Sequence, residues 1–134
     1  MTIPPGEALL STIRQTIPHL LALYAFGSRV SGEATPDSDL DLAILTPGKT
    51  EPLTLWRLSG DLAGLTGGPV DLLDLRAAST VMQYQIITTG QRLWVRDAQA
   101  ALYESFILSE KTALDEARAP LIKIIQQEGT IHGR

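Results

Sequence analysis

Apolar residues near the start of the chain follow two different spacings. Four of them recur at roughly helical spacing before Pro18, namely Leu9, Leu10, Ile13 and Ile17. This spacing predicts an amphipathic helix that ends near Thr16. The run from 20 to 26 is short, apolar and followed by Gly27. It predicts a strand that is buried on both faces.

The rest of the chain alternates between the same two patterns. Period-two alternation or short apolar runs predict strands at 39–45, 70–75 and 92–95. Helical spacing predicts helices at 53–65, at 79–88 and from Ala98 onward, where Pro120 should end or kink the helix before a second piece that runs to about Glu128. We therefore expect an α/β (α+β) fold, with a small mixed β-sheet flanked by helices and with C-terminal helices.

The length and composition suit one ordinary globular domain. A chain of 134 residues buries a single core, so we expect one domain over 1–134, with 97–134 as its C-terminal helical part. The chain is 44% hydrophobic and 19% charged, and it contains no cysteine. Residues 1–6 lack the features of a secretory signal. Both observations favour a cytoplasmic protein without disulfides or thiolate metal sites.

The charge limits the kinds of partner. A net charge of −4 argues against direct nucleic-acid binding, because such binding relies on clustered Lys and Arg. The longest uncharged apolar-rich stretch is interrupted by Pro18 and His19 and is too short to span a membrane. If the partner is a nucleotide, a metal ion must supply the positive charge.

Two carboxylates are expected to lie side by side at the start of the strand at 39–45. Successive side chains of a strand point to opposite faces, so Asp39 and Asp41 share one face while Leu40 and Leu42 turn into the core. Like charges this close are tolerated when a cation such as Mg²⁺ lies between them. The alternative is that both are solvated residues on an exposed face of the sheet.

A second candidate feature is the Gly27-Ser28 turn after the strand at 20–26. Glycine lets the backbone approach a ligand closely, and exposed amides at a helix start can receive a phosphate. The Ser28 hydroxyl adds a donor. The alternative is a plain turn in which Ser28 caps the next helix.

Together these features resemble a known family. Gly-Ser, ten intervening residues and Asp-x-Asp form the pattern of the nucleotidyltransferase superfamily related to DNA polymerase beta, and the segment GSRVSGEATPDSDLDLAIL looks like a full instance. Over nearly its whole length the chain resembles the minimal nucleotidyltransferases, specifically the MntA-like antitoxins that accompany HEPN-domain toxins. In that family a later strand supplies a third carboxylate. The matching residue is Asp71, and Asp74, three residues on, is the alternative.

The resemblance implies a specific reaction. Asp39, Asp41 and Asp71 would hold two Mg²⁺ ions, and Asp71 would also act as general base. ATP would be the donor, and the acceptor would be a tyrosine of the HEPN toxin, whose RNase activity the added AMP suppresses within a heteromeric complex. Gly27 and Ser28 would hold the β and γ phosphates. Arg29 and Ser38 are further candidate nucleotide contacts, with an ordinary surface arginine and a turn-forming serine as alternatives.

Other functions stay open on the sequence alone. The chain could inhibit its toxin by binding alone, without chemistry, or could modify a small molecule or an RNA end. Trp56 and Trp94 fall in helical and strand patterns and are expected in the core instead of in a base-stacking platform. The apolar residues of 98–134 either close the core of the domain or dock on a partner protein.

Overall fold

The computed structural model describes residues 6–32 and 39–132, apart from the side chains of Arg29, Ser31 and 121–132. The elements follow in the order α1 (Gly6–Thr16), β1 (Ala22–Phe26), α2 (Ser28–Ser31), β2 (Leu40–Leu45), α3 (Pro52–Thr66), β3 (Val70–Asp74), the 3₁₀ turn η1 (Leu75–Ala77), α4 (Thr80–Thr89), β4 (Gln91–Val95) and α5 (Gln99–His132). Each helix and strand expected from the hydrophobic pattern is present. Apart from the end of α5, their limits differ from the expected ones by no more than two residues.

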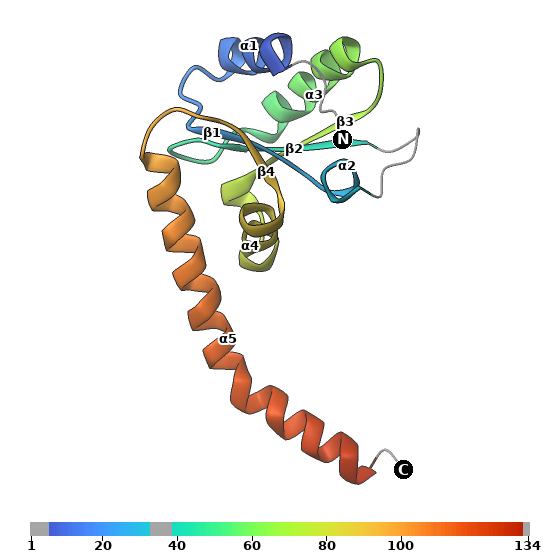
Figure 1. Ribbon diagram of the computed structural model, residues 1–134, viewed down its shortest axis with the longest axis vertical. Helices are drawn as coiled ribbons and strands as arrows, with labels where there is room; N and C mark the ends of the chain where they lie inside the picture. The colour runs from blue at the N-terminus through green and yellow to red at the C-terminus, as the bar shows by residue number, and fades with distance from the viewer. Residues whose placement is uncertain (1–5, 33–38, 133–134) are drawn as a thin grey trace.

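Four strands form one mixed sheet in the order β3-β2-β1-β4 (Figure 1). β1 is antiparallel to both β2 and β4, whereas β2 and β3 are parallel. Parallel neighbours need a crossover connection, and α3 provides it between β2 and β3. The predicted fold class, a small mixed sheet flanked by helices, is confirmed. β3 and β4 form the two edges of this sheet.

Helices α1 and α3 cover one face of the sheet. Their buried side chains pack against alternate residues of the strands, in a cluster that includes Leu9, Ile13, Leu23, Ala25, Leu40, Leu42, Ile44, Leu58, Leu62 and Leu72. Because strand side chains alternate, the residues between these positions point to the opposite face. The side chain of Asp41 in β2 points to that opposite face.

Helix α4 and the first turns of α5 cover the other face. Here Ile86 of α4 and Ala100 of α5 pack against Tyr24, Ala43 and Leu45. The Tyr24 hydroxyl donates to a Glu104 carboxylate oxygen at 2.7 Å, and Arg92 of β4 forms a salt bridge with Glu104 at 3.1 Å. These contacts hold the start of α5 on the sheet.

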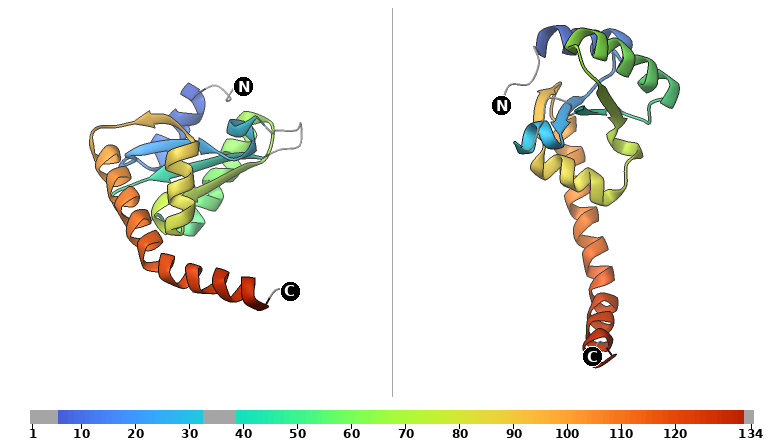
Figure 2. Two further views of the ribbon diagram at one scale, coloured as in Figure 1. Left: turned by 60° about the horizontal axis from the view of Figure 1, so that its bottom comes forward. Right: turned by 90° about the vertical axis from the view of Figure 1, so that its right-hand side faces the viewer.

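Beyond the sheet, α5 continues away from the body as one long helix (Figure 1). Pro120 lies inside α5 and does not end it, and the helix runs to His132 instead of about Glu128. Figure 2 shows that the C-terminal part of α5 runs in a different direction from its first part. Proline removes one backbone hydrogen bond and crowds the preceding turn, which bends a helix without stopping it. No helix within the described residues is long and apolar enough to cross a membrane.

Candidate active site

The N-terminal end of β2 carries two of the expected carboxylates. Asp39 immediately precedes the strand and is exposed, and Asp41 is its second residue and half-buried. Leu40 and Leu42 are buried against α1 and α3. The alternation along β2 therefore turns Asp41 toward the face that carries α4 and α5.

β3 places Asp71 directly beside Asp41. The two residues are partners in the register of the parallel strands. Neighbouring strands lie about 4.8 Å apart, and paired residues point to the same face of a sheet. Asp71 is exposed, so its carboxylate borders solvent next to the half-buried one of Asp41.

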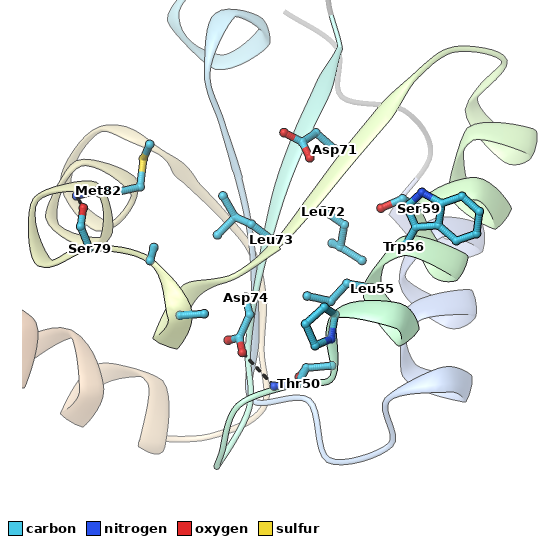
Figure 3. Close-up of a pocket in the computed structure, with 13 residues that line it drawn as sticks. Thr50, Leu55, Trp56, Ser59, Asp71, Leu72, Leu73, Asp74, Ser79 and Met82 are labelled. Carbon is cyan, nitrogen blue, oxygen red and sulfur yellow. Dashed lines mark hydrogen bonds between the residues drawn. The ribbon is translucent and has the colours of Figure 1, made fainter.

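Asp74 has a different environment. It is only 4% exposed, and its two carboxylate oxygens accept hydrogen bonds from the backbone N–H groups of Thr50 at 2.8 Å and of Arg76 at 3.0 Å (Figure 3). In this way Asp74 caps η1 and ties the end of β3 to the loop before α3. The carboxylate of Asp74 thus stabilises the fold through these hydrogen bonds, whereas the carboxylate of Asp71 is exposed and accessible to a ligand.

Truncation of the two aspartates of β3 should change the stability of the protein by unequal amounts. Asp74→Ala leaves two backbone N–H groups without their acceptor, which is expected to lower the free energy of unfolding by about 2–4 kcal/mol. Asp71→Ala removes an exposed carboxylate and is expected to change that free energy by less than about 0.5 kcal/mol. Urea unfolding of both variants measures the difference. Equal losses of stability would contradict these assigned roles.

Gly27 brings the turn after β1 against the Asp41 carboxylate. Its φ of 79° and ψ of −157° are accessible almost only to glycine. A Cβ atom at this position would also collide with Oδ2 of Asp41. Position 27 thus requires glycine for two independent reasons, and the turn lies against the carboxylate of Asp41.

Three further residues were predicted to contact the nucleotide, namely Ser28, Arg29 and Ser38, and the side chain is described for Ser28 alone of these three. Ser28 is the first residue of α2, and Gly27 occupies the N-cap position, so Ser28 does not cap this helix. Arg29 lies in the same short helix, but its side chain is outside the described part. Ser38 also lies outside the described residues.

The surroundings of Asp41 raise the pKa of its carboxyl group. Burial is the main cause that raises the pKa of Asp41, and the neighbouring charges of Asp71 and Asp39 raise it further. Among the described side chains, no Lys or Arg forms a salt bridge with any of the three. Such a group of hard oxygen donors suits Mg²⁺. No three described His, Asp or Glu side chains complete a metal site alone, and Mg²⁺ commonly takes its other ligands from substrate phosphates and water.

Three cavities border this group. One of about 730 Å³ lies between α3 and the start of β3 and is lined by residues that include Trp56 and Asp71. The other two differ in size. The smaller one, about 360 Å³, lies between the end of β1 and α4 and is lined by Phe26, Gly27, Met82, Gln85, Ile86 and Thr89. The larger one, about 600 Å³, follows β3 between α3 and α4 and has Asp71 in its wall (Figure 3). Met82 lines both cavities, so they are neighbours on either side of this side chain.

Trp56 lines the larger cavity and is not a core residue. Its side chain is 74% exposed, so the prediction that it lies in the core is wrong. α3 turns Leu58 and Leu62 into the sheet, and a residue two positions from Leu58 lies on the far side of the helix. Trp94, in contrast, is half-buried against the core, with the Arg14 guanidinium 4.8 Å from its ring centre.

Comparison with known proteins agrees with this geometry. The model of the family described as polymerase beta, nucleotidyltransferase, matches residues 8–99, which include Gly27 and all three carboxylates. The chain belongs to this nucleotidyltransferase family. The matched range runs from α1 to the start of α5, so it comprises the whole sheet and the helices that cover it.

Similar members of the nucleotidyltransferase family include an antitoxin. The chain is 33% identical over 114 residues to the protein adenylyltransferase MntA of Shewanella oneidensis, covering 85% of this chain and 82% of MntA. It is 32% identical to a chain of a toxin–antitoxin crystal structure with AMP-PNP, with a TM-score of 0.78 over 88% of this chain and 95% of that one. It is 30% identical to a chain of the tri-AMPylated S. oneidensis HEPN toxin in complex with MNT antitoxin, with a TM-score of 0.74 over 90% and 95%.

The hydrophobic pattern of this nucleotidyltransferase did not predict the cavity beside Asp71. Its walls come from α3, β3 and α4, which are separated along the chain. One signal was present: Trp56 falls outside the apolar stripe formed by Leu55, Leu58 and Leu62 of the same helix. A large aromatic residue off the buried stripe of an amphipathic helix indicates an exposed functional surface.

Proposed function

We propose that this chain is an antitoxin that transfers AMP from ATP to a tyrosine of its HEPN-domain toxin and thereby suppresses the RNase activity of that toxin. The observation that carries the proposal is the pairing of Asp71 with Asp41 in adjacent strands, next to the Gly27 turn that contacts Asp41. The family match and the similarity to MntA and to the AMPylated toxin complex support the same reaction. We propose that toxin and antitoxin form a heteromeric complex.

In this proposal Asp39, Asp41 and Asp71 hold two Mg²⁺ ions. Their carboxylate oxygens fit this ion, and their mutual repulsion is relieved by a cation. When bound, Mg²⁺ supplies the positive charge that stabilises the α-phosphoryl group and the departing pyrophosphate. The backbone at Gly27 and the Ser28 side chain hold the β and γ phosphates, and Arg29 and Ser38 are further candidates for contact with the nucleotide.

The side chains of the protein accept the proton of the acceptor hydroxyl and position the two substrates. Asp71, an exposed carboxylate on the edge strand β3, accepts the proton of the tyrosine hydroxyl. The phenolic oxygen then bonds to the α-phosphorus, and the bond from that phosphorus to the leaving pyrophosphate breaks. Holding donor and acceptor at one end of a rigid sheet lowers the entropic part of the barrier.

We further propose that residues 1–134 act as one nucleotidyltransferase domain, with 97–134 as its helical part, and that the chain works in the cytoplasm. The reaction consumes ATP, and the cysteine-free composition suits a reducing compartment.

Mass spectrometry of the toxin tests the proposed reaction. The purified chain, ATP, Mg²⁺ and the toxin encoded beside it are expected to yield toxin with AMP on tyrosine, and the other nucleoside triphosphates serve as competitors. EDTA is expected to abolish the transfer, because the carboxylates then lack the ions that neutralise them. Absence of AMP from the toxin in the complete mixture would contradict the proposal.

Inhibition by binding alone is the second candidate, favoured by the exposed apolar residues of α5. Leu102 is 70% and Phe106 is 53% exposed there, whereas Ala100 and Ile107 of the same helix are buried. A double variant, Asp39→Asn with Asp41→Asn, separates the two functions. We expect it to bind the toxin without neutralising it, and full neutralisation by this variant would establish the binding-only function.

A further inference from the structure

We propose that the cavity along β3, which we call the edge groove and define by Leu55, Trp56, Asp71, Leu73 and Met82, receives the segment of the partner that bears the acceptor tyrosine. This inference rests on the proposed function and adds to it the place where the acceptor binds. It assigns to Trp56 and Met82 the role of holding an aromatic acceptor.

The order of the strands determines on which side the acceptor must approach. The Gly27 turn follows β1, Asp41 lies on β2, and Asp71 lies on β3, so the three stand in a row across neighbouring strands. An in-line displacement needs the attacking and leaving oxygens on opposite sides of the phosphorus. With the departing pyrophosphate at the turn beside β1, the attacking hydroxyl has to come from the side of β3.

The edge groove opens on that side. β3 is an edge strand, and within the described residues β2 is the only strand that pairs with it. α3 forms one wall and α4 the other, with Asp71 between them at one end of the groove (Figure 3). A polypeptide segment thus reaches Asp71 along β3 without crossing the Gly27 turn.

The walls of the edge groove suit an aromatic side chain with a hydroxyl at its tip. Trp56 is 74% and Met82 is 39% exposed, and both offer surfaces that pack well against an aromatic ring. The carboxylate of Asp71 is the acceptor for the phenolic proton, whereas Asp74 at the other end is already engaged with Thr50 and Arg76. Of the two carboxylates in the wall of the edge groove, the one available to a ligand is therefore at the end nearest to Asp41.

The smaller cavity leaves room for the donor on its own side. This cavity is lined by Gly27 and by residues of α4. A nucleotide whose phosphates bind at the Gly27 turn would therefore occupy the cavity beside β1. Donor and acceptor would then occupy different cavities, with Met82 between them. The phenolic oxygen bonds to the α-phosphorus, pyrophosphate leaves toward the turn, and the phenolic proton passes to Asp71.

Steady-state kinetics with Trp56→Ala tests the edge groove. Leu65→Ala is the matched control, because Leu65 is a 51% exposed apolar residue of the same helix that lies outside both cavities. With ATP saturating and toxin varied, Trp56→Ala is expected to raise the KM for the toxin about tenfold or more. With toxin saturating and ATP varied, the KM for ATP is expected to change less than about twofold. Leu65→Ala is expected to leave both constants within about twofold of the unmodified chain.

Two outcomes would overturn the inference. A rise in the KM for ATP instead of the toxin would show that the edge groove holds the adenine ring, and equal constants for Trp56→Ala and Leu65→Ala would show that it holds neither substrate.

Photo-crosslinking separates this inference from the proposed reaction. With p-benzoylphenylalanine at position 56, the crosslink is expected on a tyrosine-bearing segment of the toxin even in the Asp39→Asn, Asp41→Asn background. A crosslink pattern equal to that from position 65 would refute the docking.

Discussion

Asp41→Asn is expected to slow AMP transfer by a factor of roughly a hundred or more and to raise the melting temperature of the metal-free protein. The carboxylate of Asp41 is half-buried between the charges of Asp39 and Asp71, and its pKa is raised by burial first and by these neighbours second. A carboxyl whose pKa is higher in the folded state than in the unfolded state favours folding at low pH. This contribution is lost as the pH rises through the folded pKa. Above that pKa, the neutral side chain of Asn is expected to destabilise the folded state less than the ionised side chain of Asp41 does.

Calorimetry at several pH values, with and without Mg²⁺, measures this effect. The melting temperature of Asp41→Asn should exceed that of the unmodified chain most at pH 7.5, and the gap should shrink as the pH falls to about 4, near the ordinary pKa of Asp. Mg²⁺ should stabilise the unmodified chain and not the variant, because ligands that bind the folded state stabilise it. A variant less stable than the unmodified chain at pH 7.5 without metal would contradict this account.

The same substitution should affect the reaction strongly. Loss of one carboxylate of the metal site is expected to reduce kcat/KM by a factor of roughly a hundred or more, which corresponds to about 3 kcal/mol of transition-state stabilisation. A gain in stability combined with a loss of activity distinguishes a functional carboxylate from a structural one. Activity within a few fold of the unmodified chain would exclude Asp41 from the site.

Gly27→Ala is expected to impair both the fold and the reaction. Its backbone lies in a region that side chains rarely adopt, at a cost of about 1–3 kcal/mol. The added Cβ would also collide with the Asp41 carboxylate, so that carboxylate has to leave its present position. Because small displacements of catalytic groups reduce rates severely, we expect kcat to fall by roughly a hundredfold.

Gly67→Ala is the matched control for this prediction. Gly67 also has a positive φ, of 75°, but nothing lies within 4 Å of the position of its Cβ. This variant should lose stability from the backbone strain, by about 1–2 kcal/mol, and keep its activity at saturating substrates. Equal losses of kcat in both variants would show that strain alone, and not the contact with Asp41, explains the effect of Gly27→Ala.

Local pattern in the sequence was enough to predict most of the secondary structure. The spacing of Leu9 and Ile13 predicted α1, and the uninterrupted apolar run before Gly27 predicted β1, because burial of apolar surface depends on periodicity along the chain. The i and i+2 spacing of Asp39 and Asp41 predicted a shared face for the same reason. These inferences need only the geometry of a single element.

Contacts between distant segments were decided by the tertiary structure. The choice of Asp71 over Asp74 depended on resemblance until the parallel register placed Asp71 beside Asp41 and the backbone of Thr50 and Arg76 engaged Asp74. The exposure of Trp56 likewise follows from how α3 packs on the sheet.

The sequence by itself therefore determined that the chain forms helices and strands in this order and carries a glycine-serine turn and two neighbouring carboxylates. The tertiary structure alone decided that the turn contacts Asp41, that Asp71 lies beside Asp41 and that an open groove follows β3. The physical reason is that a side chain's surroundings depend on strand order, register and helix packing, which bring together residues from separate parts of the chain.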